Sequence, residues 1–326
     1  MDQRQLGPFK VSAIGLGCMS LSHAYGTPPP REQAERVLLG ALDAGYTFFD
    51  TAAVYGVGHN ETLVGEVLKH RRSEFVLASK CGLTNGDQRE LNGRPEGLKA
   101  TCEGSLRRLQ TDVIDLYYLH RWDKRVPIEE SVGALAELVA EGKIKTIGLS
   151  EVSADTLRRA HAVHPITALQ TEYSPWTRNP EIAVLDACRE LGVTFVAFSP
   201  VGRGFLAGGV SDLAQLEDGD FRKGMPRFQG EAFAANLRMF DGFAELAREA
   251  GCTPAQLCLA WLLQKDTTQV PIPGTTNPDH MAENARAAEI RLSSEVMAKV
   301  EALVNPQTVT GPRYAPAMQA SVDTEG

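Results

Sequence analysis

The sequence of 326 residues lacks an excess of positive charge, because 33 Lys and Arg stand against 41 Asp and Glu and give a formal net charge of −8 at pH 7. Nucleic acid is therefore not expected as a partner, since its phosphates are bound by clustered Lys and Arg. No window holds the ~18 consecutive apolar residues that a membrane-spanning helix needs. The N-terminus has no basic region followed by an apolar core, the pattern of a secretory signal. We expect a soluble, cytoplasmic protein without a membrane partner.

The sequence also lacks the spacings of a metal site or a disulfide framework. Its six cysteines form no C-x-x-C pair and have no His-rich companion. We therefore expect no metal site and predict reduced, buried thiols. The cysteines are Cys18, Cys81, Cys102, Cys188, Cys252 and Cys258.

What is present is an alternation of short β-branched runs with longer stretches of helical period, which is typical of βαβ units and a parallel sheet. It predicts strands at Ser12–Leu16, Thr47–Asp50, Phe75–Lys80, Val113–His120, Ile144–Ser150, Ala168–Glu172, Thr194–Ser199 and Thr268–Ile272. It predicts helices at Glu32–Ala44, Glu61–Lys69, Pro95–Leu109, Ile128–Glu141, Ala154–His164, Glu181–Leu191, Phe233–Lys265 and Pro278–Arg286. This α/β order describes a (β/α)₈ TIM barrel, with an open doubly wound sheet as the alternative.

Three segments exceed a minimal barrel. Arg4–Val11 contains a Gly-Pro turn and is predicted to form a hairpin that closes the barrel bottom. Gly202–Gly230 has little periodicity, as is typical of a loop over a functional face. We treat residues 1–326 as a single domain, with residues 304–326 as a C-terminal tail that folds over the mouth.

Polar residues close most of the predicted strands, at the face where such barrels hold their active sites. They are Asp50, Lys80, His120, Ser150, Glu172 and Ser199. A barrel brings the first three close to Tyr55. An ammonium at Lys80 would lower the pKa of the Tyr55 phenol, Asp50 would keep Lys80 charged, and His120 would orient a carbonyl oxygen. Each residue has a structural alternative, such as a turn at Tyr55 or a core histidine at 120.

Seven segments in order, FFDTAAVYG, VLASK, IDLYYLH, IGLSE, QTEYS, FSPVGRGFLAG and PIPGT, resemble the signature series of the aldo-keto reductase family. The resemblance runs from about Ile14 to Leu303, and the GLSE segment resembles a bacterial-type branch. It implies a barrel whose catalytic tetrad is Asp50, Tyr55, Lys80 and His120. It further implies an NAD(P)H-dependent reductase of aldehydes and ketones, secondary-metabolite or xenobiotic carbonyls among them, with Tyr55 as the general acid.

The resemblance also implies a nicotinamide cofactor, although no G-x-G-x-x-G follows the first predicted strand. NADPH is expected, with NADH as the alternative, because Thr276 and Asn277 stand where many NADPH-preferring members have Lys or Arg. The nicotinamide amide is expected at Ser150, Glu151 and Gln170, with its ring stacked on Tyr173. Glu151 departs from the commoner Asn of the family. The other expected contacts are Gly17, Cys18 and Met19; Ser199, Val201, Gly202, Arg203 and Gly204 for the pyrophosphate; and Gly274, Thr275, Thr276, Asn277, His280, Glu283 and Asn284 for the adenosine end.

Substrate contacts lie on loops that the family does not fix. Tyr25, Val54 and Trp122 are the candidates, with Cys18, Met19 and Phe205 as further pocket walls. Two other functions stay open: a cofactor-binding redox sensor or regulatory subunit, and a Schiff-base aldolase that uses Lys80. No motif identifies the natural substrate, the stereochemistry of its product, the physiological direction or the oligomeric state.

Overall fold

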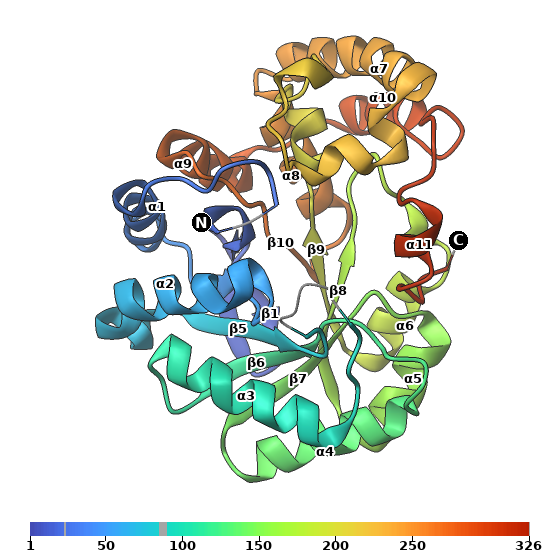
Figure 1. Cartoon of the computed structure of the whole chain (residues 1–326). Coiled ribbons are helices and arrows are strands. Elements are labelled where there is room, and N and C mark those ends of the chain that lie inside the picture. Colours follow the sequence, from blue (N-terminus) through green and yellow to red (C-terminus); the bar gives the residue numbers. More distant parts are fainter. Residues whose placement is uncertain (23, 85–89, 326) are drawn as a thin grey trace.

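Eight short parallel strands form the centre of the computed structural model, which describes residues 1–22, 24–84 and 90–325 (Figure 1). Consecutive barrel strands are neighbours throughout, in the order β10-β9-β8-β7-β6-β5-β4-β3. The two outer strands meet as well, because the amides of Gly15 and Gly17 donate to the carbonyls of Pro271 (2.9 Å) and Pro273 (3.2 Å). The sheet therefore closes into the predicted barrel, which excludes the open doubly wound sheet. The strands are β3 (Leu16–Gly17), β4 (Phe48–Asp50), β5 (Val76–Cys81), β6 (Ile114–Leu119), β7 (Ile144–Ser150), β8 (Ile166–Glu172), β9 (Thr194–Phe198) and β10 (Gln269–Pro271).

One helix follows each strand and packs outside the barrel (Figure 1). Several begin with the signals that stabilise a first turn. α3 and α8 have Pro at their first position, and Thr253 and Gln256 form a reciprocal capping box at the start of α8. The barrel helices are α1 (Arg31–Asp43), α2 (His59–Leu68), α3 (Pro95–Leu109), α4 (Ile128–Ala140), α5 (Ala154–Val163), α6 (Val184–Leu191), α8 (Pro254–Lys265) and α9 (Pro278–Arg286).

The hydrophobic core has two parts, as expected for a barrel. Side chains of alternating strand positions face the barrel axis, while the others pack against the helices. The hairpin of β1 (Gln3–Leu6) and β2 (Phe9–Ser12) adds Leu6 and Val11, both fully buried, to the interior cluster. The predicted hairpin is therefore confirmed, and it plugs the barrel bottom.

Two further helices and the C-terminal tail lie outside the eight βα units. α7 (Gly230–Glu249) and α10 (Ser294–Leu303) pack together beside the barrel (Figure 1). The segment between β9 and α7 contains four short 3₁₀ helices, η5 (Gly202–Ala207), η6 (Leu213–Gln215), η7 (Phe221–Gly224) and η8 (Pro226–Phe228). α11 (Pro316–Gln319) lies in the tail, of which residue 326 falls outside the described part. No helix within the described ranges is long and apolar enough to cross a membrane.

The predicted elements match the structure with three notable differences. Ser12 belongs to the hairpin, so the first barrel strand begins at Leu16 and the prediction of one strand over Ser12–Leu16 is wrong. The single predicted helix Phe233–Lys265 is two helices, because Gly251 adopts a left-handed φ of +68° and Thr253 caps a new helix. α10 was not predicted.

Candidate active site

The carboxyl ends of β4, β5 and β6 bring together the four residues that the sequence predicts to be catalytic. Lys80 is buried, and its Nζ donates to the carboxylate of Asp50, to the carbonyl of Thr51 at 2.9 Å and to the Tyr55 hydroxyl at 3.3 Å. The rings of His120 and Tyr55 form a T-shaped pair, with the two centroids 5.8 Å apart. Asp50, Lys80, Tyr55 and His120 thus form one connected cluster.

Burial decides the protonation of this cluster. Burial alone would lower the pKa of Lys80, but Asp50 and Tyr55 outweigh it, and the pKa of Lys80 is raised. Burial also raises the pKa of Tyr55, and the opposing effect of Lys80 does not cancel it. Lys80 lowers the pKa of Tyr55, as expected, but its effect is smaller than that of burial, so the net shift of the pKa is upward. Tyr55 keeps its proton across the neutral range, as a proton donor must.

An unusual turn holds Tyr55. The three residues after it, Gly56, Val57 and Gly58, all have positive φ, at +56°, +54° and +89°. A Cβ at Gly58 would lie 2.8 Å from Cδ of Arg108, so glycine is needed for close packing as well as for its backbone angle. The turn leads directly into α2, and it directs the Tyr55 hydroxyl toward Lys80.

Gln170, on β8, contacts the cluster through Asp50. It was predicted to hold the nicotinamide amide, but in the structure its Nε2 donates to Oδ2 of Asp50 at 2.7 Å. Since Lys80 binds the other oxygen of Asp50, both carboxylate oxygens are occupied. Gln170 therefore fixes the orientation of Asp50.

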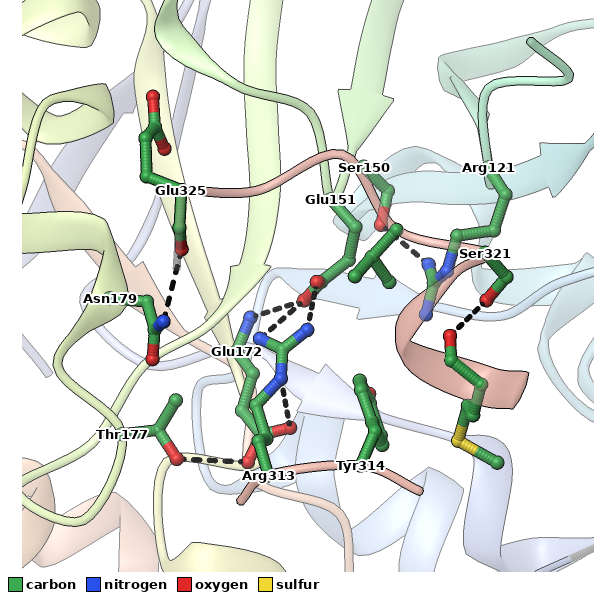
Figure 2. A network of polar contacts seen from close by, with 12 residues as sticks. Arg121, Ser150, Glu151, Glu172, Thr177, Asn179, Arg313, Tyr314, Ser321 and Glu325 are labelled. Atoms are coloured by element: carbon green, nitrogen blue, oxygen red, sulfur yellow. Dashed lines mark hydrogen bonds and ion pairs between the residues drawn. The ribbon is translucent and has the colours of Figure 1, made fainter. Parts of the chain in front are cut away.

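Ser150 lies at the end of β7, beside a residue that the sequence analysis missed. Nη1 of Arg121 donates to the Ser150 hydroxyl at 3.2 Å (Figure 2). It also donates to the carbonyl of His120 at 2.6 Å. The signal was present in the sequence, because Arg121 follows His120 directly at the end of a strand that carries a candidate catalytic residue.

Glu151 and Arg203, both expected at the cofactor, are instead bound to other protein groups. The carboxylate of Glu151 is buried, pairs with both Nη atoms of Arg313, and accepts from the Glu172 amide at 3.0 Å (Figure 2). Arg203 is buried, pairs with Glu172 and donates to the Tyr314 hydroxyl at 2.9 Å. These contacts do not fit the predicted roles, because a partnered buried charge has little left to offer a ligand.

We call Glu151, Glu172, Arg203, Arg313 and Tyr314 the tail cluster, because Arg313 and Tyr314 come from the C-terminal tail. Arg313 also lies near Glu172, with Nε 3.9 Å from Oε2 (Figure 2). Burial alone would raise the pKa of Glu172, but Arg203 and Arg313 outweigh it, and the pKa of Glu172 is lowered. The tail continues to Asp323, whose amide donates to the carbonyl of Glu151. The predicted fold of the tail toward the ends of the strands is therefore observed.

Tyr173 does not lie at the mouth. Its side chain is fully buried, its ring packs against Phe195 and Trp261, and its hydroxyl donates to Glu181 at 2.5 Å. The predicted stacking of the nicotinamide ring on Tyr173 is therefore wrong. Phe198, the last residue of β9, is half-buried and packs against the interior cluster, so it presents an aromatic ring at the barrel mouth. Strand alternation could have identified it.

The glycine loop after β9 is tightly turned. Ser199 has φ +48°, and the amide of Gly202 donates to its carbonyl at 3.0 Å. A Cβ at Gly202 would lie 2.9 Å from the Trp176 ring, so this glycine serves packing. Val201 and Gly204 are half-buried and remain candidates for the predicted pyrophosphate contact.

The residues predicted for the adenosine end gather where β10 leads into α9. Asn277 caps α9 by accepting from the amide of Asp279 at 2.9 Å, while Glu283 accepts from the Thr253 hydroxyl at 2.6 Å. Thr275 and Thr276 are half-buried, His280 is exposed and Asn284 is buried. Glu283 is therefore partly engaged in holding α8 and α9 together.

Gly17 and Gly274 pack closely, since a Cβ at Gly274 would lie 2.9 Å from the Gly17 carbonyl. The Ser20 hydroxyl lies near the same Cβ position, at 3.4 Å, and is buried without a hydrogen-bond partner among the described residues. A buried hydroxyl of this kind fits the contact surface of a polar ligand. Cys18 is buried, and burial raises the pKa of its thiol, so it is not a reactive thiolate. Met19 is half-buried.

The predicted substrate walls differ in their surroundings. Tyr25 packs on Phe221, with ring centroids 5.1 Å apart, and Val54 is buried beside Tyr55. Trp122 is half-buried and donates from Nε1 to the carbonyl of Val126 at 2.9 Å. Phe205 is buried and stacks on Trp176 at 4.5 Å, so it belongs to the core rather than to a pocket wall.

Comparison with known proteins agrees with this geometry. The model of the aldo/keto reductase family matches residues 13–305. The chain belongs to this family. As an aldo/keto reductase it is an oxidoreductase that acts on carbonyl groups and uses a nicotinamide cofactor.

Three solved structures illustrate the similarity of this aldo/keto reductase to characterised proteins. A glycerol dehydrogenase from Gluconobacter oxydans is 27% identical with a TM-score of 0.86, and the match covers 97% of this chain and 98% of that one. The holo form of an aldo-keto reductase from Bacillus halodurans is 29% identical with a TM-score of 0.78, over 94% and 97% of the two chains. A thermostable aldo-keto reductase in complex with the inhibitor epalrestat is 31% identical with a TM-score of 0.74, over 93% and 100%.

Proposed function

We propose that this aldo/keto reductase uses NADPH to reduce small-molecule aldehydes and ketones to alcohols, with Tyr55 as the proton donor. The observation that carries the proposal is the buried Lys80–Asp50 pair with its ammonium 3.3 Å from the Tyr55 hydroxyl. We further propose that the enzyme works in the reducing cytoplasm, which is consistent with its six unpaired cysteines, all within the described residues.

Each residue of the site has a separate role in this proposal. The cofactor supplies a hydride to the carbonyl carbon when it is bound. Tyr55 and His120 flank the position of the carbonyl oxygen, and His120 orients that oxygen by a hydrogen bond. As negative charge develops there, Tyr55 gives up its proton, and the Lys80 ammonium stabilises the phenolate that remains. Asp50, held by Gln170, keeps Lys80 charged.

Cofactor contacts are proposed on the groups that remain available: Ser150, the Phe198 ring, the loop of Ser199, Val201 and Gly204, and Thr276 and His280 near the start of α9. Hydroxyl, amide and imidazole groups at the start of α9 can accept the 2′-phosphate of NADPH with help from the helix dipole. NADH is the alternative cofactor, because no Lys or Arg that could pair with a 2′-phosphate lies within residues 274–285.

The test is Tyr55→Phe. Loss of the proton donor should lower kcat about 10²–10⁴-fold, whereas the cofactor Kd should stay nearly the same, because only the transition state uses the hydroxyl. The measurement is the decrease in reduced-nicotinamide absorbance with an activated aromatic aldehyde, run with NADPH and with NADH. Cofactor binding is followed by protein fluorescence. Comparable losses in turnover and in cofactor affinity would contradict the assignment of Tyr55.

The same assay addresses the two alternatives. Wild-type protein that binds the cofactor tightly but turns over neither nucleotide would favour the sensor. An imine between a carbonyl substrate and Lys80, trapped by borohydride, would favour the aldolase. The structure gives little support to the aldolase, because Lys80 is buried in an ion pair and its raised pKa keeps it protonated and therefore not nucleophilic.

A further inference from the structure

Arg121 is a half-buried cation at the barrel mouth. It directly follows His120, and its Nη1 donates to two uncharged groups, the carbonyl of His120 and the hydroxyl of Ser150 (Figure 2). Its Nε and Nη2 form no hydrogen bond to another described residue. Neither atom is among the fully buried polar atoms that lack a hydrogen-bond partner. Part of the guanidinium therefore has no partner among the described residues.

The charge of Arg121 is not matched by a carboxylate within the described ranges. The nearby acidic groups are engaged elsewhere: Glu151 pairs with Arg313, and Asp123 pairs with Arg125 at 2.8 Å. A guanidinium that is partly removed from water without a counter-charge is costly unless a bound anion compensates it. Burial raises the pKa of the Tyr55 hydroxyl, and the charge of Arg121 is among those that oppose this rise. Arg121 thus lies close to the reacting centre.

We propose that Arg121 binds an anionic group of the substrate, so that the preferred substrates are aldehydes or ketones that carry a carboxylate. A guanidinium offers two parallel N–H groups that match the two oxygens of a carboxylate. Because Arg121 and His120 are adjacent, an anion on Arg121 and a carbonyl oxygen at Tyr55 and His120 belong to one short molecule. This inference rests on the proposed reductase function and specifies its substrate class.

The experiment compares a matched pair of aldehydes, 4-carboxybenzaldehyde and its neutral methyl ester, methyl 4-formylbenzoate. The quantity is the ratio of kcat/KM for the acid to kcat/KM for the ester. Arg121→Gln should lower this ratio about 10- to 100-fold, the range of a hydrogen bond to a charged group. The loss should fall mainly on the KM of the acid, because a remote anionic group is bound equally in ground and transition states. Arg121→Lys, which keeps the positive charge, should restore part of the lost acid-to-ester ratio.

Lys124→Gln is the control, since it removes one positive charge from the same loop, where the exposed Lys124 bonds to Val322 and Asp323 of the tail. It should leave the ratio unchanged. Equal losses with acid and ester in Arg121→Gln would overturn the proposal, because they indicate that Arg121 only positions Ser150. An increased Kd for NADPH would also overturn it, since the anion would then be a phosphate of the cofactor. If the wild type reduces the ester but its ratio does not respond to Arg121→Gln, the substrate class is wrong and the reductase stands. If it reduces neither aldehyde, the reductase itself fails.

Discussion

At the scale of single residues, two aromatic side chains near the ends of neighbouring strands point in opposite directions. Phe198 ends β9 and packs against the barrel interior, whereas Tyr173 follows β8 and is enclosed between the barrel and its outer helices. Side chains alternate between the two faces of a strand, so a shift of one position moves an aromatic ring from the mouth to the outer shell. The ring at position 198 is therefore the better candidate for contact with the cofactor.

Paired substitutions separate these two roles. Phe198→Ala should weaken cofactor binding about 2- to 10-fold, the range of one aromatic stacking contact. Tyr173→Leu, which removes the aromatic ring, should leave the cofactor Kd unchanged but destabilise the fold by about 2–4 kcal/mol, because the buried ring loses its packing on Phe195 and Trp261 and the hydroxyl loses its hydrogen bond to Glu181. Fluorescence titration with NADPH and thermal unfolding are the measurements. Weaker cofactor binding in Tyr173→Leu than in Phe198→Ala would restore Tyr173 as the stacking residue.

At the scale of elements, the turn η2 (Tyr55–Gly58) carries backbone strain beside the proton donor. Val57 has φ +54° and is 71% exposed, so a β-branched residue occupies a left-handed conformation without burial in compensation. Asn adopts this conformation more readily than Val does. The turn is nevertheless held in place, because Gly58 packs on Arg108, which binds the buried Glu61 at 2.7 Å.

Val57→Asn should therefore stabilise the protein by about 1 kcal/mol, since the left-handed conformation costs a β-branched residue at least that much. Val163→Asn is the control, because Val163 is 43% exposed but lies in the regular helix α5. It should give no gain. Thermal unfolding of both variants is the measurement. A melting temperature of Val57→Asn that is no higher than that of the wild type would show that the turn is not strained.

At the scale of the whole molecule, the tail cluster attaches the last residues of the chain to the mouth of the barrel. It joins the ends of β7 and β8, the loop after β9 and the tail through buried charges. Asp323 strengthens the attachment, because its carboxylate accepts from the Ser153 amide at 3.2 Å and from the Thr156 hydroxyl at 2.7 Å, at the start of α5. The mouth of the barrel is therefore completed by residues of the C-terminal tail.

Glu172→Gln should destabilise the protein by about 3–5 kcal/mol at pH 7, because it leaves the buried Arg203 without its counter-charge. The pKa of Glu172 is lowered on folding, so its contribution is fully present above its ordinary value of 4.5 and is lost as the pH falls through the lowered value. The difference between variant and wild type should therefore shrink below pH 4.5. Thermal unfolding at pH 7 and in acid measures it.

Glu190→Gln is the matched control, because the Glu190–Arg158 pair lies on the surface. It should leave the melting temperature nearly unchanged at both pH values. A difference for Glu172→Gln that persists undiminished in acid would show that a property other than the charge of Glu172 maintains the tail cluster.

The sequence by itself determined the barrel, the succession of its strands and the four residues that lie together at its mouth. Hydrophobic periodicity is a local property, so it can be read from the sequence. Parallel strands of a barrel end at one face, so the sequence alone predicted that Asp50, Lys80 and His120 lie together there. Their mutual contacts in the structure agree with that expectation.

Only the tertiary structure decided how the surrounding charges are paired. Glu151 and Arg203 were expected to bind the cofactor. Instead, Glu151 pairs with Arg313, which lies 162 positions further along the chain. Arg203 pairs with Glu172. Burial, not Lys80, sets the direction of the pKa of Tyr55. The pairing of a charge and its desolvation depend on residues that are distant in the chain, and a local pattern carries no information about them.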